Sequence, residues 1–367
     1  MGFKCGIVGL PNVGKSTLFN ALTKTAQAQA ANYPFCTIEP NTGEVAVPDP
    51  RMRALADIAK SKELIPTRIS FVDIAGLVRG ASKGEGLGNK FLANIREVDA
   101  TVHVLRCFED DDVTHVEGRI NPVGDAETIE TELMLADLES LERRTEQTRK
   151  RAASKDKESL TLLPVMDAAL KLLQDGKPAR TLLPTLAAEE KLILQGLNLL
   201  TAHPVLYVCN VAEGDAASGN AHTRAVEEMA KAQGAETVII SAAIESEVAQ
   251  LPDEEAKEFL EALGLHEAGL DQLIRAGYKL LDLITYFTVG PKETRAWTIE
   301  RGTKAPAAAG VIHTDFERGF IRAFTIGYDD YIAFGGETGA REAGKARDEG
   351  KEYVVQDGDV IHFRFNT

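Results

Sequence analysis

The sequence predicts an α/β protein built on a doubly wound, mostly parallel sheet, with an inserted α-helical hairpin and a small β-rich module at the end. An apolar run, a glycine-rich loop and a helical pattern follow one another over residues 4–24. Helical periodicity without a strand rhythm occupies residues 125–200, and strand-like runs return after residue 280. At roughly 150 residues per domain, the length of 367 residues allows two or three domains.

The first element is a phosphate-binding loop. Residues 9–17 read Gly-Leu-Pro-Asn-Val-Gly-Lys-Ser-Thr, the P-loop pattern, between a strand-like apolar run and a helical pattern over residues 17–24. Glycines let the backbone approach phosphate oxygens, and the helix that follows directs the positive end of its dipole at the anion. We expect Lys15 to reach the β- and γ-phosphates and the Ser16 hydroxyl to bind Mg²⁺. The nucleotide contacts predicted here are Asn12, Val13, Gly14, Lys15, Ser16 and Thr17.

The next strand ends in a predicted magnesium ligand. Residues 67–73 read as a strand, and Asp-Ile-Ala-Gly over residues 73–76 is the D-x-x-G pattern of switch GTPases. We expect Asp73 to hold Mg²⁺ and the amide of Gly76 to sense the γ-phosphate. Thr37 lies in a loop-like stretch between the two motifs, so we expect it to close over Mg²⁺ when the triphosphate is bound. The alternative for Thr37 is an ordinary loop hydroxyl.

The motif that should select the base departs from the guanine pattern Asn-Lys-x-Asp. A strand over residues 204–209 is followed by Asn210, Val211, Ala212 and Glu213, so the lysine is absent and a glutamate replaces the aspartate. That aspartate accepts two hydrogen bonds from guanine, and a longer side chain has to be repositioned to do so. A mismatched hydrogen-bonding site discriminates strongly, so we expect ATP to be accepted and preferred. The residues predicted beside the base are Asn210, Val211, Glu213, Ser241 and Ala242.

Taken together, these motifs resemble those of the YchF family of Obg-like ATPases, a branch of the translation-factor-related P-loop proteins. The matching stretches are residues 9–17, 32–41, 73–77, 115–122, 210–213, 295–297, 312–317 and 355–365. The resemblance runs nearly from end to end. It implies a G domain interrupted by a helical hairpin, a C-terminal TGS domain, hydrolysis of ATP in preference to GTP, and association with ribosomes.

The predicted organisation follows from the patterns and the resemblance together. The first part of the G domain covers residues 1–124, a helical coiled-coil insertion 125–200, the second part of the G domain 201–278 and a β-grasp-like TGS domain 279–367. The predicted function is that of a ribosome-associated, Mg²⁺-dependent ATPase with weaker GTPase activity, which acts as a regulatory switch in translation or the stress response. The alternatives are a nucleotide-gated scaffold with negligible turnover and a GTP-preferring switch GTPase.

The sequence predicts slow hydrolysis that a partner stimulates. Small GTPases place a water-orienting glutamine directly after D-x-x-G, and here that position is Leu77. His115, on a polar loop after a central strand, is a candidate to act on the catalytic water; the alternative is an ordinary loop histidine. With Lys15 and Gly76 it completes the predicted catalytic set. Asn12 resembles the asparagine of K⁺-activated GTPases, so K⁺ is a further candidate cofactor.

The helical insertion carries a basic tip. Asp125 is a candidate cap for its first helix, and apolar residues at helical spacing continue to about residue 200. Residues 142–158 hold seven basic and four acidic side chains, a local charge of +3 in a chain of net charge −15. A charge run is usually a solvated helix face. The contrast with the acidic chain makes an RNA-binding tip at residues 143–157 the functional alternative.

Composition sets the remaining limits. Hydrophobic residues make up 44% and charged residues 26%, a profile typical of globular proteins in water. No apolar run approaches the roughly 18 residues of a membrane span, and the four cysteines form no C-x-x-C pair. We therefore expect a cytoplasmic protein with reduced thiols and no membrane partner. The terminal β-rich module is expected to contain one short helix, over residues 305–312. It offers no paired catalytic groups and is expected to bind or regulate.

Overall fold

The computed structural model describes residues 3–30, 41–74, 87–109 and 120–366. The chain forms two compact units, one of Met1–Glu44 with Ser70–Gly277 and one of Val45–Ile69 with Tyr278–Thr367. The sequence placed residues 45–69 in the first part of the G domain, whereas in the structure they belong to the second unit. The predicted limits of the helical insertion within the first unit stay a prediction.

The first unit is built on the predicted doubly wound sheet. Its six strands lie in the order β2 (Thr42–Ala46), β4 (Arg68–Asp73), β1 (Lys4–Val8), β5 (Ala100–Arg106), β6 (Val205–Asn210) and β7 (Glu236–Ile240). The pairs β1–β4, β1–β5, β5–β6 and β6–β7 are parallel. Every residue of β5 and β6 is buried, which explains why these strands read as nearly continuous apolar runs.

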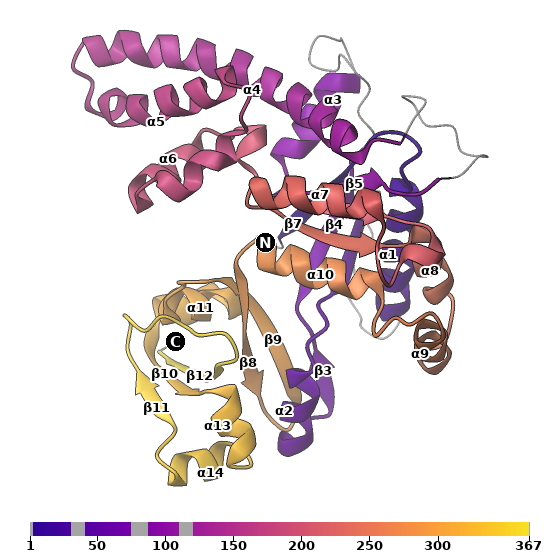
Figure 1. Cartoon of the computed structure of the whole chain (residues 1–367). Helices are drawn as coiled ribbons and strands as arrows, with labels where there is room; N and C mark the ends of the chain where they lie inside the picture. The colour runs from indigo at the N-terminus through magenta and orange to yellow at the C-terminus, as the bar shows by residue number, and fades with distance from the viewer. Residues whose placement is uncertain (1–2, 31–40, 75–86, 110–119, 367) are drawn as a thin grey trace. The chain divides into compact units, whose positions relative to one another are not determined.

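Helices cover both faces of this sheet. They are α1 (Lys15–Ala30), α3 (Leu87–Arg96), α7 (Ala221–Ala232), α8 (Ala242–Val248), α9 (Asp253–Ala262) and α10 (Gly269–Leu280). Helices α7 and α10 lie on opposite sides of β7 (Figure 1). On the α7 face, Val226 and Ala230 pack against Tyr207 and Cys209 of β6. The apolar stripe of the helix and the apolar run of the strand thus form one core.

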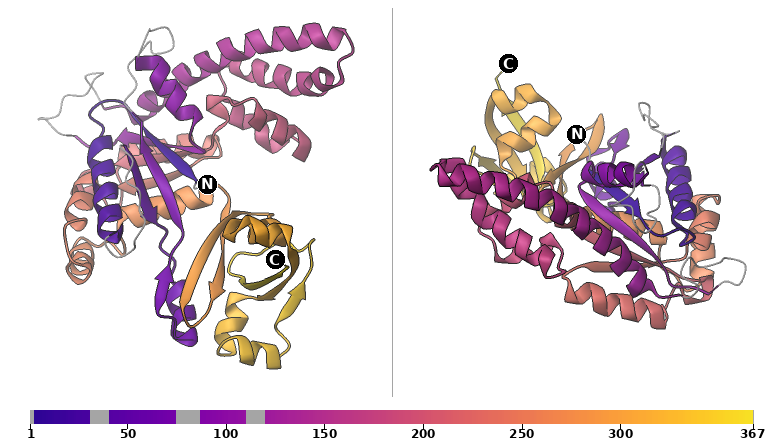
Figure 2. Two further views of the ribbon diagram at one scale, coloured as in Figure 1. Left: turned by 180° about the vertical axis from the view of Figure 1, so that it is seen from behind. Right: turned by 90° about the horizontal axis from the view of Figure 1, so that it is seen from above.

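The helical insertion is the predicted hairpin. Helices α4 (Pro122–Ala153) and α5 (Lys157–Gln174) run side by side and are joined by a tight turn (Figures 1 and 2). The predicted cap at Asp125 is wrong: the side chain of Asn121 caps α4 by accepting from the N–H of Gly124 at 3.1 Å. Pro122 occupies the first helical position, where a missing N–H costs nothing, so the helix begins four residues earlier than a cap at Asp125 would allow.

Short helices follow the hairpin in the chain and pack against it. They are η1 (Ala179–Thr185), α6 (Ala188–Gly196) and η2 (Leu200–Ala202). The buried carboxylate of Asp137 on α4 accepts hydrogen bonds from the N–H groups of Leu200 and Thr201, each at 2.8 Å. Burial raises the pKa of Asp137, although these donors favour its charged form. The start of η2, the short helix that precedes β6, is therefore fixed to α4 by buried hydrogen bonds.

The second unit is a mixed β-sheet covered by helices. Its strands lie in the order β11 (Arg347–Glu349), β10 (Phe320–Ile326), β12 (Val360–Phe365), β8 (Leu283–Val289), β9 (Glu293–Glu300) and β3 (Glu63–Ile65). The helices of this unit are α2 (Arg51–Ala59), α11 (Ala305–Ile312), α12 (Thr314–Arg318), α13 (Tyr328–Ala333) and α14 (Glu337–Glu342). The sequence predicted α11 with the same bounds. It did not predict that β3 pairs with β9, or that Met52 and Leu55 of α2 pack on Phe287.

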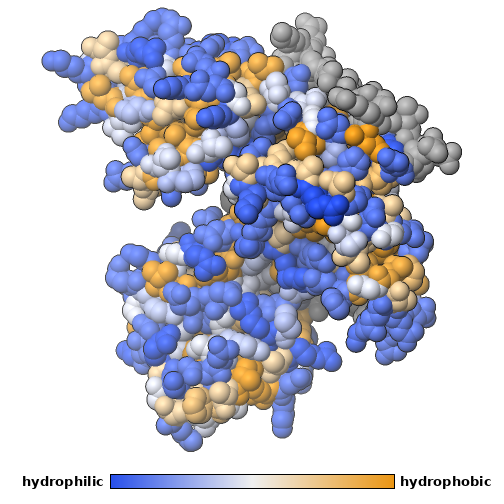
Figure 3. All heavy atoms as spheres, in the orientation of Figure 1, coloured by the Kyte–Doolittle hydropathy of each residue, from blue (hydrophilic) through white to orange (hydrophobic). Residues whose placement is uncertain are grey.

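The mixture of polar and apolar side chains on the surface matches the amino-acid composition of the sequence. Figure 3 shows hydrophilic and apolar side chains intermixed over the helical hairpin. None of the helices in the described part of the chain combines the length and the apolar character that crossing a bilayer requires.

Candidate nucleotide site

The P-loop joins β1 to α1 in a strained backbone conformation. Asn12 has a φ of 63° and Gly14 a φ of 91°, both in the left-handed region. A Cβ atom at Gly9 would come within 2.8 Å of the carbonyl oxygen of Val104, and one at Gly14 within 2.1 Å of the Asn210 side chain. The two glycines of the motif are thus required by close approach as well as by backbone shape. The strand, loop and helix that the P-loop pattern predicts are all present.

Lys15 and Asp73 lie together at the carboxyl ends of neighbouring strands. Parallel pairing places Ile7 of β1 beside Asp73 of β4, just before the P-loop begins. The ammonium group of Lys15 donates to Oδ1 of Asp73 and forms an ion pair with it. Both side chains are largely shielded, with exposed fractions of 11% and 21%. The structure therefore brings together the phosphate-binding and magnesium-binding groups that the sequence predicted separately.

The donor set at this edge suits a magnesium ion. The Ser16 hydroxyl lies in the first turn of α1, at the helix N-terminus that follows the loop. Oxygen ligands from one or two protein side chains, completed by phosphate and water, are what Mg²⁺ takes in nucleotide sites. No group of three or more His, Cys, Asp or Glu side chains able to hold a metal occurs among the described residues. Ser16 and Asp73 thus fit Mg²⁺ better than a metal that needs a full protein cage.

Asn210 connects the P-loop to the loop predicted beside the base. Its side chain is buried, with Nδ2 donating to the carbonyl of Val13 at 2.9 Å and Oδ1 accepting from the N–H of Ala242 at 2.9 Å. These two hydrogen bonds reach backbone groups of the P-loop and of the start of α8, which are far apart in sequence. Asn210 therefore fixes the P-loop relative to the start of α8.

The other residues predicted at the base lie in contrasting surroundings. Glu213 is exposed and begins the short helix η3 (Glu213–Asp215). Val211 is buried, and its N–H donates to the carbonyl of Ile240 at 2.9 Å, so it supports the loop from within. Ser241 is also buried, and its Oγ has no hydrogen-bond partner among the described residues. The contact that each makes with a nucleotide stays a prediction.

Several predicted residues lie outside the described part of the chain. These are Thr37, Gly76, Leu77 and His115. The structure therefore leaves the switch threonine, the γ-phosphate sensor and the candidate catalytic histidine as predictions. Thr17 is described: it is exposed on α1 and lines a hollow of about 340 Å³ with Asn20, Thr23, Lys24 and Ser246.

Sequence reasoning missed one polar contact that supports the site. Glu245 of α8 is buried and accepts from the N–H groups of Gly269 at 2.8 Å and Leu270 at 3.1 Å, capping α10. Burial raises the pKa of Glu245. Helix α8, which begins at Ala242, is thereby held at its first residue by Asn210 and at Glu245, near its middle, by the start of α10. The only signal in the sequence is an acidic residue close to an apolar run, which is weak evidence for such a role.

The chain is similar to known proteins over its full length. A family model described as "50S ribosome-binding GTPase" matches residues 4–136, and a YchF C-terminal model described as "Protein of unknown function (DUF933)" matches residues 283–366. The chain is 60% identical over its full length to the ribosome-binding ATPase YchF of Pasteurella multocida and 54% identical to that of Bacillus subtilis, covering all of each relative.

Solved structures show the same likeness. The YchF GTPase of Schizosaccharomyces pombe superposes with a TM-score of 0.89 at 39% identity, over 99% of this chain and 98% of that one. A GTP-binding protein from Pyrococcus horikoshii OT3 superposes with a TM-score of 0.62 at 18% identity, over 99% of this chain and 100% of that one, which shows a shared fold alone.

Proposed function

Because the chain belongs to the YchF family, we propose that it is a ribosome-binding, Mg²⁺-dependent ATPase that prefers ATP to GTP and acts as a nucleotide-controlled switch in the cytoplasm. The P-loop domain that the family model matches supports hydrolysis of a nucleoside triphosphate and does not by itself specify which one. The choice of nucleotide, the metal dependence and the regulatory role are the finer parts of the proposal.

The observation that carries the choice of nucleotide is the hydrogen bonding of Asn210. Its amide holds the P-loop and the start of α8 in place, which supports a base subsite whose position does not depend on residue 213. Glu213 is exposed, and it occupies the motif position at which a GTPase presents an aspartate to guanine N1 and N2. A carboxylate moved by one methylene leaves guanine donors without matched acceptors, which disfavours GTP.

The residues proposed to hold Mg²⁺ are Ser16 and Asp73, with Thr37 as the switch ligand. The ion would supply positive charge that offsets the negative charge of the phosphates during hydrolysis. Lys15, which lies against Asp73, is proposed to bind phosphate oxygens, and Gly14, which has no Cβ, is proposed to let the backbone approach them. Among these groups none abstracts a proton from water. Turnover is therefore expected to be slow until a partner, His115 or K⁺ beside Asn12 provides the missing assistance.

The proposed partner is the ribosome, through RNA contacts at the basic tip of residues 143–157. Part of this tip is already engaged within the protein: Arg149 pairs with Asp167 at 2.6 Å, and Arg144 donates to the carbonyl of Leu197. No ion pair within the described residues involves Arg151, Lys155 or Lys157. These three side chains, at the end of α4 and the start of α5, are the ones available for phosphate. We further propose that residues 125–200 form this ribosome-facing element between the two parts of the G domain, 1–124 and 201–278, and that 279–367 is a TGS module.

The direct test is calorimetry with ATP and GTP in the presence of Mg²⁺, followed by single-turnover hydrolysis with and without ribosomes. ATP should bind more tightly, and ribosomes should accelerate phosphate release. Glu213→Asp should raise the affinity for GTP, with Glu227→Asp, an exposed glutamate on α7, as the matched control. Tighter binding of GTP to the unaltered protein would refute the ATP preference. Absence of Mg²⁺-dependent phosphate release, with or without ribosomes, would favour a nucleotide-gated scaffold.

A further inference from the structure

Strand β7 ends the sheet of the first unit and has one free edge. It pairs only with β6 among the described strands, and the carbonyl of Ile240 accepts from Val211 on that side. Successive residues of a strand direct their N–H and C=O groups to opposite sides. Thr237 and Ile239 therefore direct theirs away from β6, and no partner for these groups occurs among the residues that the structure describes. An unpaired edge of this kind is a template for another strand.

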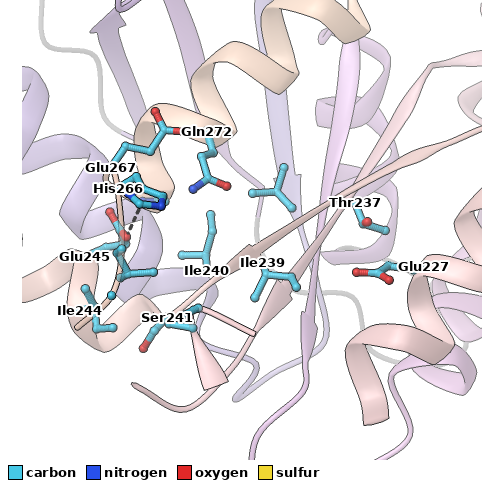
Figure 4. A pocket seen from close by; sticks show the side chains of 16 residues that line it. Glu227, Thr237, Ile239, Ile240, Ser241, Ile244, Glu245, His266, Glu267 and Gln272 are labelled. Carbon is cyan, nitrogen blue, oxygen red and sulfur yellow. Dashed lines mark hydrogen bonds between the residues drawn. The ribbon is translucent and has the colours of Figure 1, made fainter. Parts of the chain in front are cut away.

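A cavity of about 430 Å³ opens along this edge. Its lining includes β7 residues 237–240, the α7 residue Glu227, and Gln272 of α10 with the loop residues His266 and Glu267. In Figure 4, Glu227 lies near Thr237, while His266, Glu267 and Gln272 lie across from Ile239 and Ile240. The cavity thus follows the strand rather than enclosing a compact ligand, and it is bounded by polar side chains at its two ends.

The charge of the lining indicates which peptide would fit. Three glutamates and no lysine or arginine line the cavity. Glu245 is buried and already caps α10, and Glu267 is paired with Arg275. Glu227 is exposed and forms no ion pair within the described residues. The carboxylate of Glu227, at the Thr237 end of the cavity, is therefore available to pair with a positively charged side chain. The net charge of the chain, −15, is in keeping with a basic partner.

We propose that the free edge of β7 binds an extended, basic peptide segment of a partner protein, which joins the sheet as an additional strand. The N–H and C=O groups of Thr237 and Ile239 supply the backbone hydrogen bonds, and Glu227 pairs with a lysine or arginine of the peptide. Alternate side chains of such a strand face the same side, which suits a peptide with basic residues at every second position. This surface adjoins the predicted base loop, since Ser241 also lines the cavity, and binding there does not require hydrolysis.

The test is a fluorescence anisotropy titration with a labelled octapeptide that alternates valine and lysine. We expect saturable binding of this peptide. A peptide with glutamate in place of lysine should bind about tenfold more weakly because it meets Glu227. A valine–lysine peptide N-methylated at alternate backbone positions should bind weaker by a similar factor because it lacks the donors for β7.

Variants of the protein separate the backbone contact from side-chain packing. Ile239→Pro removes the N–H at the free edge and leaves the groups that face β6 in place. It should weaken the basic peptide about tenfold, whereas Ile239→Val, which keeps the N–H, should change its affinity less than about twofold. Glu227→Lys should weaken binding of the basic peptide and strengthen binding of the acidic one. This variant tests the proposal even if Ile239→Pro does not fold.

Three results would overturn the proposal. The first is no saturable binding of the basic peptide up to millimolar concentration. The second is equal affinity for the N-methylated peptide. The third is a concentration-dependent dimer in sedimentation that Ile239→Pro dissociates, which would assign the edge to a second copy of the chain.

Discussion

The side-chain amide of Asn210 donates a hydrogen bond from Nδ2 to the backbone carbonyl of Val13 at 2.9 Å, across 197 positions of sequence. The same amide accepts the N–H of Ala242 through Oδ1. One buried side chain at the end of β6 therefore holds the P-loop and the start of α8 at a defined separation. The predicted nucleotide contacts on these two segments are thus positioned by a residue that links them.

Replacing Asn210 should weaken both folding and nucleotide binding. Asn210→Ala leaves the Val13 carbonyl and the Ala242 N–H buried without a partner, which should cost about 1–3 kcal/mol of unfolding free energy for each group. Asn210→Asp keeps the acceptor for Ala242 but removes the donor to Val13, so it should fall between the wild type and Asn210→Ala. Urea unfolding and ATP calorimetry measure both effects. Equal stability of all three proteins would contradict the role assigned to Asn210.

The Lys15–Asp73 pair should be essential for hydrolysis and dispensable for folding. Asp73→Asn removes a proposed Mg²⁺ ligand, so Mg²⁺-dependent phosphate release should fall by about 10²-fold or more. The matched control is Asp348→Asn, which removes an exposed partner of Arg322 and should leave turnover unchanged. Titration of activity with Mg²⁺ provides the readout. Full activity of Asp73→Asn at saturating Mg²⁺ would exclude Asp73 as a ligand.

Two glycines with positive φ allow the effect of backbone strain on the protein to be measured separately from the effect of a steric clash. Gly14→Ala places a Cβ within 2.1 Å of Asn210 at a φ of 91°, so it should disrupt the loop and abolish detectable ATP binding. Gly234→Ala, at a φ of 68° with nothing within 4 Å, should cost only about 1–2 kcal/mol of backbone strain. Thermal unfolding and calorimetry compare them. Wild-type ATP affinity of Gly14→Ala would show that the loop rearranges around the new methyl group.

His103 of β5 should make stability fall as the pH decreases. Burial lowers the pKa of His103 from 6.5 to about 4, so the unfolded chain binds its proton more readily than the folded chain. Between pH 6.5 and 4 the unfolded state therefore gains protons first, and up to about 3 kcal/mol of stability disappears through this window. His103→Phe should remove this part of the pH dependence of urea unfolding, whereas His313→Phe, at an exposed site, should not. An unchanged pH profile in His103→Phe would contradict the assignment.

The basic tip should govern ribosome affinity in a salt-dependent manner. Changing Arg151, Lys155 and Lys157 to glutamine should weaken binding and reduce the slope of log affinity against log salt by about 1 for each phosphate group that is no longer neutralised. The control changes Lys257, Arg301 and Lys304, which are paired with acidic side chains elsewhere on the surface. Ribosome co-sedimentation over a range of salt concentrations measures both. Unchanged affinity and slope in the tip variant would mean that these residues form a solvated helix face.

The sequence by itself determined the local parts of the molecule. The P-loop order of strand, loop and helix, the long helical hairpin and the helix at Ala305–Ile312 all follow from patterns within short windows. In such windows apolar spacing and glycine placement decide the backbone directly. The P-loop pattern predicts the class of ligand for the same reason, since contiguous N–H groups and an adjacent lysine form a phosphate subsite in loops of this kind.

Only the tertiary structure decided which distant residues meet. Residues 45–69 join the second unit because β3 pairs with β9 and Met52 and Leu55 pack on Phe287, contacts that no local pattern encodes. The hydrogen bond from Asn210 to Val13, the capping of α10 by Glu245 and the free edge of β7 depend likewise on strand order and chain crossing. Hydrogen bonds between sequence-distant groups are chosen by the packing of the whole fold, so periodicity and motif spacing do not reveal them.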